Sequence, residues 1–366
     1  MTRRTVAGGI LAAAGIFYTA CSAPPVPLWQ GSHYTVQARD QAVERGLNFI
    51  YYSIARNPKY FRDWGTDLLS AFYNIAVTSE NPRLRRMAWS MGRERALEWR
   101  RLNPTVPTHA NADEVADLIF GSQAADGLGV PDRRMQKQLR HAAARFSAVN
   151  YLGFDPVREP PPADIPDECP RCGYQNARGA TVCTHCGAKL TMRTRYSVMI
   201  DALITTYTGD LYGITLGAHY RDVLRWIPSM RPYPPPRRGN SSEYYDAVYM
   251  VTHLVYTYND YSQKRIRPEC FPEEFAYLKS NLRQAIKDKD PETMGEYLDS
   301  LRDFGLNRSD PSIRTGYDYL LSVQNSDGSW GDPTDTGPYG RYHPTWTAID
   351  GLREYHWSKV LPCPAF

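Results

Sequence analysis

Apolar residues recur at intervals of three and four along most of the chain, and Asn-Pro, Asp-Pro and Gly breaks interrupt this periodicity. Such spacing places the apolar side chains on one face of an α-helix, and the breaks mark helix ends. Alternation typical of strands is almost absent outside one cysteine-rich segment. We therefore predict a mostly α protein. Its expected helices lie at about 35–55, 66–79, 82–102, 112–122, 133–149, 195–208, 216–227, 241–261, 272–287, 291–304, 311–324 and 344–357.

Two proline-rich segments interrupt the helical pattern. Residues 151–168 read YLGFDPVREPPPADIPDE, and residues 228–240 read PSMRPYPPPRRGN. Proline at this density fixes φ and removes backbone donors, so both segments are predicted to be extended connections. The first leads into a cysteine-rich segment, which we interpret as an insertion at 164–191 between two parts of a helical body, 26–150 and 192–366. The second is a long loop that either covers a cavity mouth or runs along the surface.

Two Cys-x-x-Cys pairs with ten residues between them form the most specific motif of the chain. Their cysteines are Cys169, Cys172, Cys183 and Cys186. Each pair places two thiolates on one tight turn, and two such turns complete the tetrahedral sulfur shell that Zn²⁺ prefers. Gly173 and Gly187 follow the pairs, where the chain often needs a positive φ. The segment resembles a small zinc ribbon with a structural zinc, and two disulfides or a redox pair are the alternatives.

The composition is that of an ordinary globular protein. The 366 residues are 42% hydrophobic and 22% charged, and the net charge of +4 is dispersed, so we expect no nucleic-acid partner. Tyrosine is abundant, with 26 residues, and suits either the wall of a cavity or a wet aromatic core. Outside the two pairs and the N-terminal segment, only Cys270 and Cys363 remain, and the sequence allows one disulfide between them.

The N-terminal segment has the layout of an export signal. Arg3 and Arg4 precede an apolar stretch from Val6 to Ala20, which small residues and prolines follow. A twin arginine is typical of signals that export folded proteins, and Cys21 is typical of a lipoprotein cleavage site. We predict that residues 1–23 are an export signal or membrane anchor, and that the chain is exported, periplasmic or membrane-anchored. Lipidation, ordinary cleavage and an uncleaved anchor stay open, as does a cytoplasmic chain with an apolar start.

A polar stripe on the predicted helix 241–261 contains the main candidates for chemistry. Its members follow one another at steps of three, four, three and four: Asp246, Tyr249, His253, Tyr256 and Asp260. This spacing aligns them on one face, and a continuous polar line on an apolar helix must face water, another polar helix or a lined cavity. We predict catalytic roles for Asp246, His253 and Asp260 and places in a substrate cavity for the two tyrosines.

Neighbouring helices offer residues that would complete such a site. His219, with Asp222, is predicted to line the cavity, and His343 is a fourth catalytic candidate. Two or three imidazoles with a carboxylate suit Zn²⁺ or Fe²⁺, so a second metal stays open, whereas an Asp paired with a His suits acid–base chemistry. The alternative for each histidine is a core or helix-cap role. Three carboxylates on the helix 291–304 are expected to form a solvated face: Glu296, Asp299 and Asp303.

A repeat-like segment lies near the C-terminus. Residues 314–331 read RTGYDYLLSVQNSDGSWG, with Gln324 and Trp330 at its core. The segment resembles the QW repeat of squalene-hopene cyclases, oxidosqualene cyclases and the β-subunits of protein prenyltransferases. The resemblance implies an α/α toroid of about six helical hairpins, here with the zinc ribbon inserted. It also implies that Gln324 and Trp330 fasten one hairpin to the next and that His343 lies on an inner helix.

The resemblance implies a function only in outline. The Asp-x-Asp-Asp and Asp-Cys-Thr-Ala-Glu runs of the cyclases are absent, as is the Asp-x-Cys of the prenyltransferase zinc site. The expected function is therefore that of an exported or membrane-attached toroid, acting as an enzyme on a hydrophobic, isoprenoid-type substrate in a central cavity by acid–base or metal-assisted chemistry. The alternative is a non-catalytic binding or scaffold protein that contacts a protein partner through the toroid and the ribbon.

Overall fold

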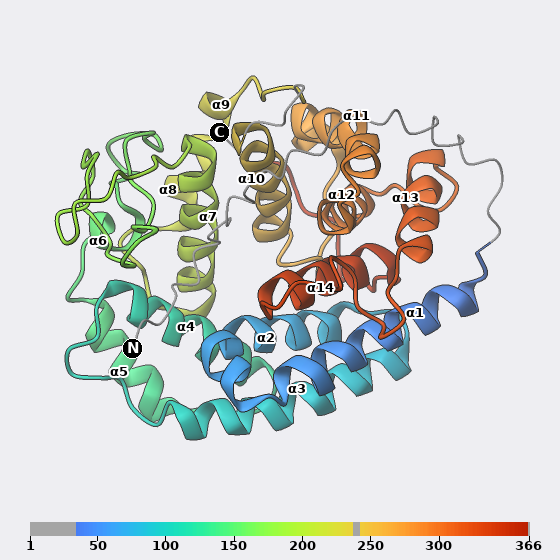
Figure 1. Ribbon diagram of the computed structural model, residues 1–366, viewed down its shortest axis with the longest axis horizontal. Helices are drawn as coiled ribbons and strands as arrows, with labels where there is room; N and C mark the ends of the chain where they lie inside the picture. Colours follow the sequence, from blue (N-terminus) through green and yellow to red (C-terminus); the bar gives the residue numbers. More distant parts are fainter. Residues whose placement is uncertain (1–33, 237–241, 365–366) are drawn as a thin grey trace.

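The computed structural model describes residues 34–236 and 242–364, and these residues are mainly helical (Figure 1). Within these two ranges there is no β-strand, only isolated bridges such as Ser79 with Tyr355. None of the helices in these ranges is both long and apolar enough to cross a membrane. The predicted export signal at 1–23 lies outside the described residues.

Most helices follow one another with short connections, and longer ones lie around the ribbon, between α9 and α10 and between α13 and α14. Their bounds are α1 Val36–Phe49, the π-helical η1 Ile50–Ala55, α2 Pro58–Thr78, α3 Pro82–Leu102, α4 Ala112–Gly127, α5 Arg133–Ala143, α6 Ala148–Leu152, α7 Arg195–Tyr212, α8 Tyr220–Leu224, α9 Ile227–Met230, α10 Ser242–Tyr258, the 3₁₀ turn η2 Pro268–Cys270, α11 Pro272–Asp288, α12 Pro291–Asp303, α13 Pro311–Ser322 and α14 Tyr339–Leu352.

Several helices begin where the sequence shows an Asn-Pro or Asp-Pro break. Asn57 precedes Pro58, and its side chain accepts hydrogen bonds from the backbone of the first turn of α2. Asp290 does the same for α12, accepting from the backbone N–H of Thr293 at 3.0 Å. A short acceptor side chain satisfies donors that the helix leaves free, and proline fits the first turn because its missing N–H is not needed there. These breaks are therefore helix starts.

Several predicted helices are wrong in extent. The helix expected at 66–79 begins at Pro58, and the one expected at 112–122 continues to Gly127. The helix expected at 216–227 consists of the short α8 and α9, because Gly217 has a φ of +78° and His219 is the N-cap of α8. The helix expected at 133–149 ends at Ala143, and Ser147 caps a separate α6. The last helix begins before its proline, so that Pro344 lies inside α14, and it ends at Leu352.

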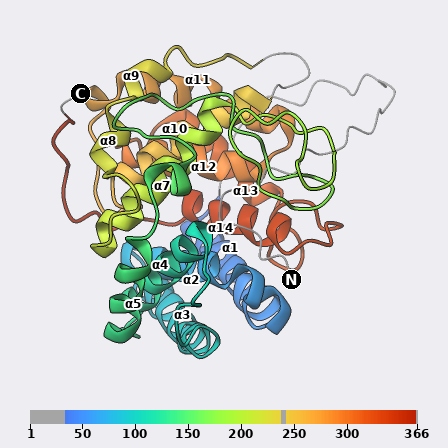
Figure 2. The same cartoon turned by 90° about the vertical axis from the view of Figure 1, so that its left-hand side faces the viewer.

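Six of the described helices contact one another in a closed cycle. Helix α2 contacts α4, which contacts α7, and the cycle continues through α10, α12 and α14 back to α2. These helices surround the middle of the molecule in Figure 1, and the other helices pack outside them. Figure 2 shows α3 and α5 on the outer side of α2 and α4, which they contact. Together the helices enclose one continuous hydrophobic core.

Helices α12 and α14 approach each other closely because small residues meet at their crossing. A Cβ atom on Gly295 would lie 2.4 Å from the backbone of Thr347. A Cβ atom on Gly351 would lie 2.9 Å from the carbonyl oxygen of Gly295. Side chains at these positions would push the helices apart. The contact therefore fixes how residues on the two helices face each other.

Gln324 and Trp330 connect the loop after α13 to the helices beside it. The Gln324 side-chain amide donates hydrogen bonds to the carbonyl oxygens of Ala42, on α1, and Gly328, both at 2.9 Å. Trp330 is fully buried, and its indole N–H donates to the carbonyl oxygen of Leu320 at 2.8 Å. The pair thus joins the end of α13 to α1 across the chain.

Cys270 and Cys363 form a disulfide. The sequence allowed this pairing without requiring it. The bond attaches the C-terminal segment beside the start of α11, and the backbone N–H of Arg265 donates to Lys359 nearby, at 2.8 Å. The end of the chain is therefore held against the helical body by a covalent bond and by backbone pairing.

Candidate functional site

The four ribbon cysteines converge on one point. The Sγ atoms of Cys169 and Cys186 lie 3.5 Å apart, and those of Cys172 and Cys183 lie 3.7 Å apart. Zinc–sulfur bonds of about 2.3 Å in a tetrahedral shell place the sulfurs about 3.8 Å from one another. The four thiolates therefore fit a closed zinc shell, which leaves no position for a substrate.

Backbone geometry makes the two halves of the ribbon equivalent. The N–H of Gly173 donates to Cys169 at 2.8 Å, and the N–H of Gly187 donates to Cys183 at 2.9 Å. Both glycines have positive φ, +69° and +74°, as expected for turns that wrap a metal. His185 is not part of the cysteine cluster, and its ring stacks on Tyr174 with centroids 5.5 Å apart.

The ribbon has a small core of its own. Cys169, Cys183 and Leu190 form a buried cluster separate from the main core. The ribbon joins the helical body through a paired neck, in which Asp167 donates its backbone N–H to Thr191 at 2.8 Å. The ribbon is thus a locally assembled unit on the surface of the helical body.

The predicted polar stripe on α10 divides in the structure. Asp246, near its start, is buried and accepts a hydrogen bond at 2.7 Å from Thr194, the N-cap of α7. Asp260, beyond its end, has a φ of +65°, pairs with Lys264 at 2.9 Å and accepts from the hydroxyl of Tyr207. Both carboxylates are thus occupied by structural contacts and do not lie with His343.

The middle of the stripe faces α12. The hydroxyl of Tyr249 lies 3.4 Å from a carboxylate oxygen of Glu292, and the hydroxyl of Tyr256 lies 3.4 Å from the carbonyl oxygen of Glu296. His253, between the two tyrosines, directs Nδ1 to the carbonyl oxygen of Tyr249 at 2.7 Å. This part of the stripe therefore contributes to a shared site with α12.

The structure does not place His219 in that site, which corrects its predicted role. Half of its side chain is exposed, and its Nδ1 lies 2.9 Å from Asp210. Its backbone N–H donates to Asp222 at 3.1 Å, which closes a capping box at the start of α8. His219 and Asp222 therefore form a helix cap at the surface.

Three residues from α12 and α14 meet opposite the middle of α10. Oxygens of Glu292 and Glu296 and a ring nitrogen of His343 all lie within 4.8 Å of one another. Nδ1 of His343 lies 3.0 Å from Oε1 of Glu292, an ion-pair distance without the alignment of a hydrogen bond. We call Glu292, Glu296 and His343 the central cluster.

Burial and charge determine the protonation of the central cluster. Burial alone lowers the pKa of His343, but the carboxylates of Glu292, Asp67 and Glu296 outweigh this effect and raise the pKa to about 9. Burial acts to raise the pKa of Glu292, yet the charge of His343 leaves it below its ordinary value. His343 and Glu292 are therefore both charged at neutral pH.

Two further groups beside this ion pair are neutral at pH 7. Burial raises the pKa of Glu296 to about 8, despite a hydrogen bond from Thr252. Burial also lowers the pKa of His253 to about 4, and the charge of His343 adds to this effect. A protonated carboxyl and an uncharged imidazole thus lie next to a charged pair, and environments that separate protonation states in this way are typical of acid–base sites.

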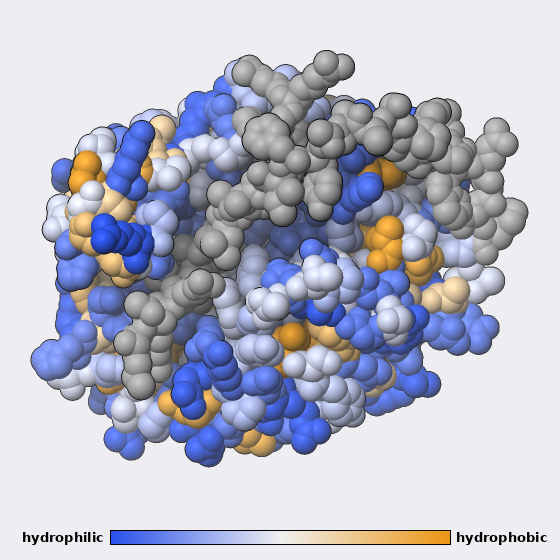
Figure 3. All heavy atoms as spheres, in the orientation of Figure 1, coloured by the Kyte–Doolittle hydropathy of each residue, from blue (hydrophilic) through white to orange (hydrophobic). Residues whose placement is uncertain are grey.

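Aromatic rings surround the central cluster. Tyr339 stacks on His343 with ring centroids 4.8 Å apart, and Trp346 lies edge-on to it at 6.0 Å. Trp64, from α2, lies 5.1 Å from Tyr339. Figure 3 shows the described surface recessed near the middle of this face, where mostly hydrophilic residues are visible. The cluster is therefore walled by aromatic side chains from helices on both sides.

The expectation of a solvated carboxylate face on α12 is wrong. Glu296, Asp299 and Asp303 are at most 4% exposed. Asp303 accepts hydrogen bonds from Ser262 and Trp357, both at 2.8 Å. Sequence reasoning also missed Glu292 as a site residue. The available signal was the spacing of the carboxylates on this helix. Glu292, Glu296, Asp299 and Asp303 follow one another at steps of four, three and four, and alternating steps of this kind also define the α10 stripe.

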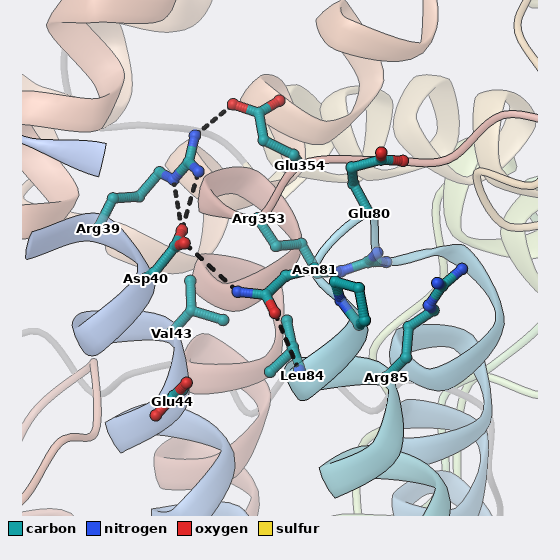
Figure 4. Close-up of a pocket in the computed structure, with 11 residues that line it drawn as sticks. Arg39, Asp40, Val43, Glu44, Glu80, Asn81, Leu84, Arg85, Arg353 and Glu354 are labelled. Carbon is teal, nitrogen blue, oxygen red and sulfur yellow. Dashed lines mark hydrogen bonds and ion pairs between the residues drawn. The ribbon is translucent and has the colours of Figure 1, made fainter. Parts of the chain in front are cut away.

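A surface pocket lies away from the central cluster (Figure 4). Its volume is about 400 Å³, and it lies between α1, the start of α3 and residues after α14. Arg39 pairs there with Asp40 at 2.8 Å and also with Glu354, and Asn81 donates to Asp40 at 3.3 Å. These charged groups satisfy one another, so the pocket does not show the unpaired groups of a reactive site.

The comparisons with known proteins identify the ribbon. A model of the zinc-ribbon domain matches residues 169–190. No curated protein and no solved structure matches the chain. The motif match and the convergence of Cys169, Cys172, Cys183 and Cys186 confirm the predicted structural Zn²⁺ site.

Proposed function

We propose that the helical body is an α/α toroid and that the protein is an enzyme acting on a hydrophobic, isoprenoid-type substrate. The closed cycle of contacts through α2, α4, α7, α10, α12 and α14 supports the toroid, since such folds place one ring of helices inside another. The attachment of Gln324 to α1 supports it further, because the QW-type residues of this architecture fasten neighbouring hairpins.

The observation that carries the enzymatic proposal is the central cluster itself. Glu292, Glu296 and His343 converge within 4.8 Å, and His253 lies opposite on α10. Buried ionisable groups that gather at one place on several helices are costly unless they serve a purpose, and catalytic sites are where such groups concentrate. Asp246 and Asp260 have structural roles in this proposal.

The hydrogen bond of His253 defines what its ring can do. Nδ1 lies 2.7 Å from a carbonyl oxygen, which only accepts, so Nδ1 carries the proton. The other nitrogen, Nε2, then has the free lone pair of a neutral imidazole. His253 is therefore unprotonated at neutral pH and offers Nε2 as a proton acceptor, although its lowered pKa makes it a weak base, while the central cluster supplies charge and a carboxyl group.

Aromatic side chains support the choice of substrate class. Trp64, Tyr339, Trp346 and Tyr256 supply apolar ring surface around the site. Aromatic faces bind hydrocarbon and also attract positive charge, which isoprenoid reactions often develop. This combination favours an isoprenoid-type substrate over a small polar one.

Location outside the cytoplasm is part of the proposal. The disulfide between Cys270 and Cys363 supports it, because disulfides persist mainly in oxidising compartments. The twin arginine at Arg3 and Arg4 agrees with the export of a folded protein that already contains its zinc. Periplasmic and membrane-anchored forms both fit these observations.

The test uses farnesol and squalene as probes with the full chain. We expect at least one probe to bind saturably, as monitored by tryptophan fluorescence. We also expect that probe to be converted to a product that mass spectrometry detects. His253→Gln should lower turnover by at least about 100-fold with little change in binding, because it removes a proton-transfer group. His219→Ala is the matched control, since His219 is half exposed and remote from the cluster.

Each result separates the enzyme from its alternative. Absence of saturable binding would contradict the substrate class. Binding without any product would contradict catalysis on these substrates and favour a non-catalytic toroid that binds a hydrophobic molecule or a protein partner. Equal losses with His253→Gln and His219→Ala would show that the cluster has no special role.

A further inference from the structure

The central cluster has the donor set of a metal centre. Glu292 and Glu296 are one helical turn apart on α12, and His343 faces them from α14. Two carboxylates and an imidazole are ligands that first-row divalent metals accept. With bonds of about 2.1 Å, ligand atoms around such a metal lie roughly 3 to 4 Å apart, and the three donor atoms here already lie within 4.8 Å of one another.

The fold holds these donors in place. Gly295 lies between the two glutamates in the sequence, and its contact with Thr347 brings α14 against α12 at this level. Asp290 caps the start of α12 and fixes the first turn, from which Glu292 projects. The donors therefore stand on two rigid helices, as a preorganised metal site requires.

His343 supplies the nitrogen donor of the cluster. Its Nδ1 atom is buried and lies 3.0 Å from Oε1 of Glu292, with which it forms an ion pair. A cation bound between this nitrogen and the two carboxylates would satisfy all three groups at once.

No Arg or Lys occupies the carboxylates of this region. Glu292, Glu296 and Asp67 lie around His343, and no Arg or Lys of the described residues lies within ion-pair distance of these three carboxylates. A divalent cation that displaces the protons of Glu296 and His343 would therefore bind their donor atoms without breaking a salt bridge to Arg or Lys.

We propose that Glu292, Glu296 and His343 bind a divalent first-row transition metal, such as Zn²⁺ or Fe²⁺, as a second metal centre distinct from the zinc ribbon. Three protein ligands leave at least one position open for water or substrate, in contrast to the closed shell of four thiolates. This proposal does not require that the proposed enzymatic function be correct, because binding is measured without turnover.

The experiment measures metal content in the full chain after loading with Zn²⁺ and gel filtration. Two zinc ions per chain are expected. The Cys169→Ser, Cys172→Ser double variant should retain one, which resides in the central cluster. Glu296→Gln and His343→Ala should each retain one zinc ion, which resides in the ribbon. His219→Ala is the matched imidazole control and should retain both zinc ions.

Folding of each variant is checked by circular dichroism, and Glu292→Gln replaces any variant that does not fold, since Glu292 is only partly buried. A single zinc that the ribbon double variant removes would overturn the proposal. A second zinc that survives in the folded cluster variants would overturn it as well, because the metal would then bind elsewhere. Turnover of an isoprenoid probe by a protein with one zinc would overturn the metal centre and leave the enzymatic proposal standing.

Discussion

The zinc ribbon and the central cluster are assembled in opposite ways. The ligands of the ribbon lie within 17 residues of one another, and local hydrogen bonds shape both of its turns. The central cluster combines residues of α12 and α14, and residues of α10 face it, so that the region joins positions as distant as Tyr249 and His343. A local motif therefore reveals the first site, whereas only the packing of helices reveals the second.

The two regions also differ in what stabilises them. The ribbon buries only a few side chains, among them two of its own cysteines, so its fold depends on the metal. The helical body has a continuous hydrophobic core to which nearly every helix contributes. Loss of metal is therefore expected to unfold one region and spare the other.

The largest effect is predicted for the ribbon. Replacing Cys169 and Cys172 by Ser removes two thiolates and should abolish zinc binding there, since structural zinc contributes roughly 10–16 kcal/mol to such folds. Hydrogen exchange should show that residues 164–191 lose protection, while the thermal unfolding of the helical body changes little. Zinc analysis and exchange mass spectrometry measure the two effects.

His185→Ala is the matched control for the ribbon. His185 lies between the last two cysteines but stacks on Tyr174 and is not part of the cysteine cluster, so the variant should keep its zinc. Loss of cooperative unfolding of the whole chain in the double cysteine variant would contradict the comparison. It would mean that the ribbon is an essential part of the helical core.

A smaller effect is predicted at the crossing of α12 and α14. Gly295→Ala places a Cβ atom 2.4 Å from the backbone of Thr347, and backbone atoms cannot yield as a flexible side chain can. The free energy of unfolding should fall by about 2–3 kcal/mol, the upper part of the usual cost of overpacking, because the close atoms belong to the backbone. Urea denaturation measures this change, and metal binding at the proposed second centre should weaken with it.

Gly65→Ala provides the comparison for this variant. Gly65 also lies inside a helix, but the nearest atoms to its added Cβ would be aromatic side-chain atoms at 3.3 Å. Because alanine also favours helix, the change in unfolding free energy should stay within about 1 kcal/mol. Equal losses in both variants would show that the crossing of α12 and α14 is not specially tight.

Much of the helical content could be predicted from the sequence, and the reasons for the errors are physical. Capping residues and prolines mark the starts of α3, α12 and α13, and these signals are local. The same signal at Asn57 and Pro58 was missed, because the helix was expected to begin at 66. The helix expected at 216–227 failed because Gly217 adopts a positive φ that apolar periodicity does not report. The cycle of helix contacts depends on distant residues and could not be predicted from periodicity.

The candidate site was predicted in part. The four zinc ligands were readable because the chemistry of the motif lies in adjacent residues. Tyr249, His253 and His343 were candidates, and the structure brings them to one region. Glu296 was taken for a solvated residue because spacing defines a helix face but not what covers it. The small residue Gly295, which lets α14 cover that face, determines its burial.

The smallest effect is predicted for the pair of carboxyls farther along α12. Burial is the main cause that raises the pKa of Asp303 to about 6, against hydrogen bonds from Trp357, Ser262 and Asn259. Burial, and then the charge of Asp303, raise the pKa of Asp299 well above its ordinary value. Arg302, Arg353, Asp350 and Tyr355 also act on this pair. These carboxyls therefore bind protons more tightly when the chain is folded.

Stability should therefore fall as pH rises. A carboxyl whose pKa is raised in the folded chain stabilises the folded chain at pH values below its ordinary pKa, near 4. This contribution is lost as the pH rises through the pKa that the carboxyl has in the folded chain. Between about pH 4 and 6 the unfolding free energy should decrease by about 1–2 kcal/mol from this pair. Asp299→Asn should flatten this dependence in urea titrations, because the amide resembles the protonated acid. The exposed Asp63→Asn should leave it unchanged. If the unfolding free energy of Asp299→Asn depended equally steeply on pH, this pair would not take up protons on folding. Hydrogen bonds to charged carboxylates would then stabilise this end of α12, much as thiolates bound to zinc stabilise the ribbon.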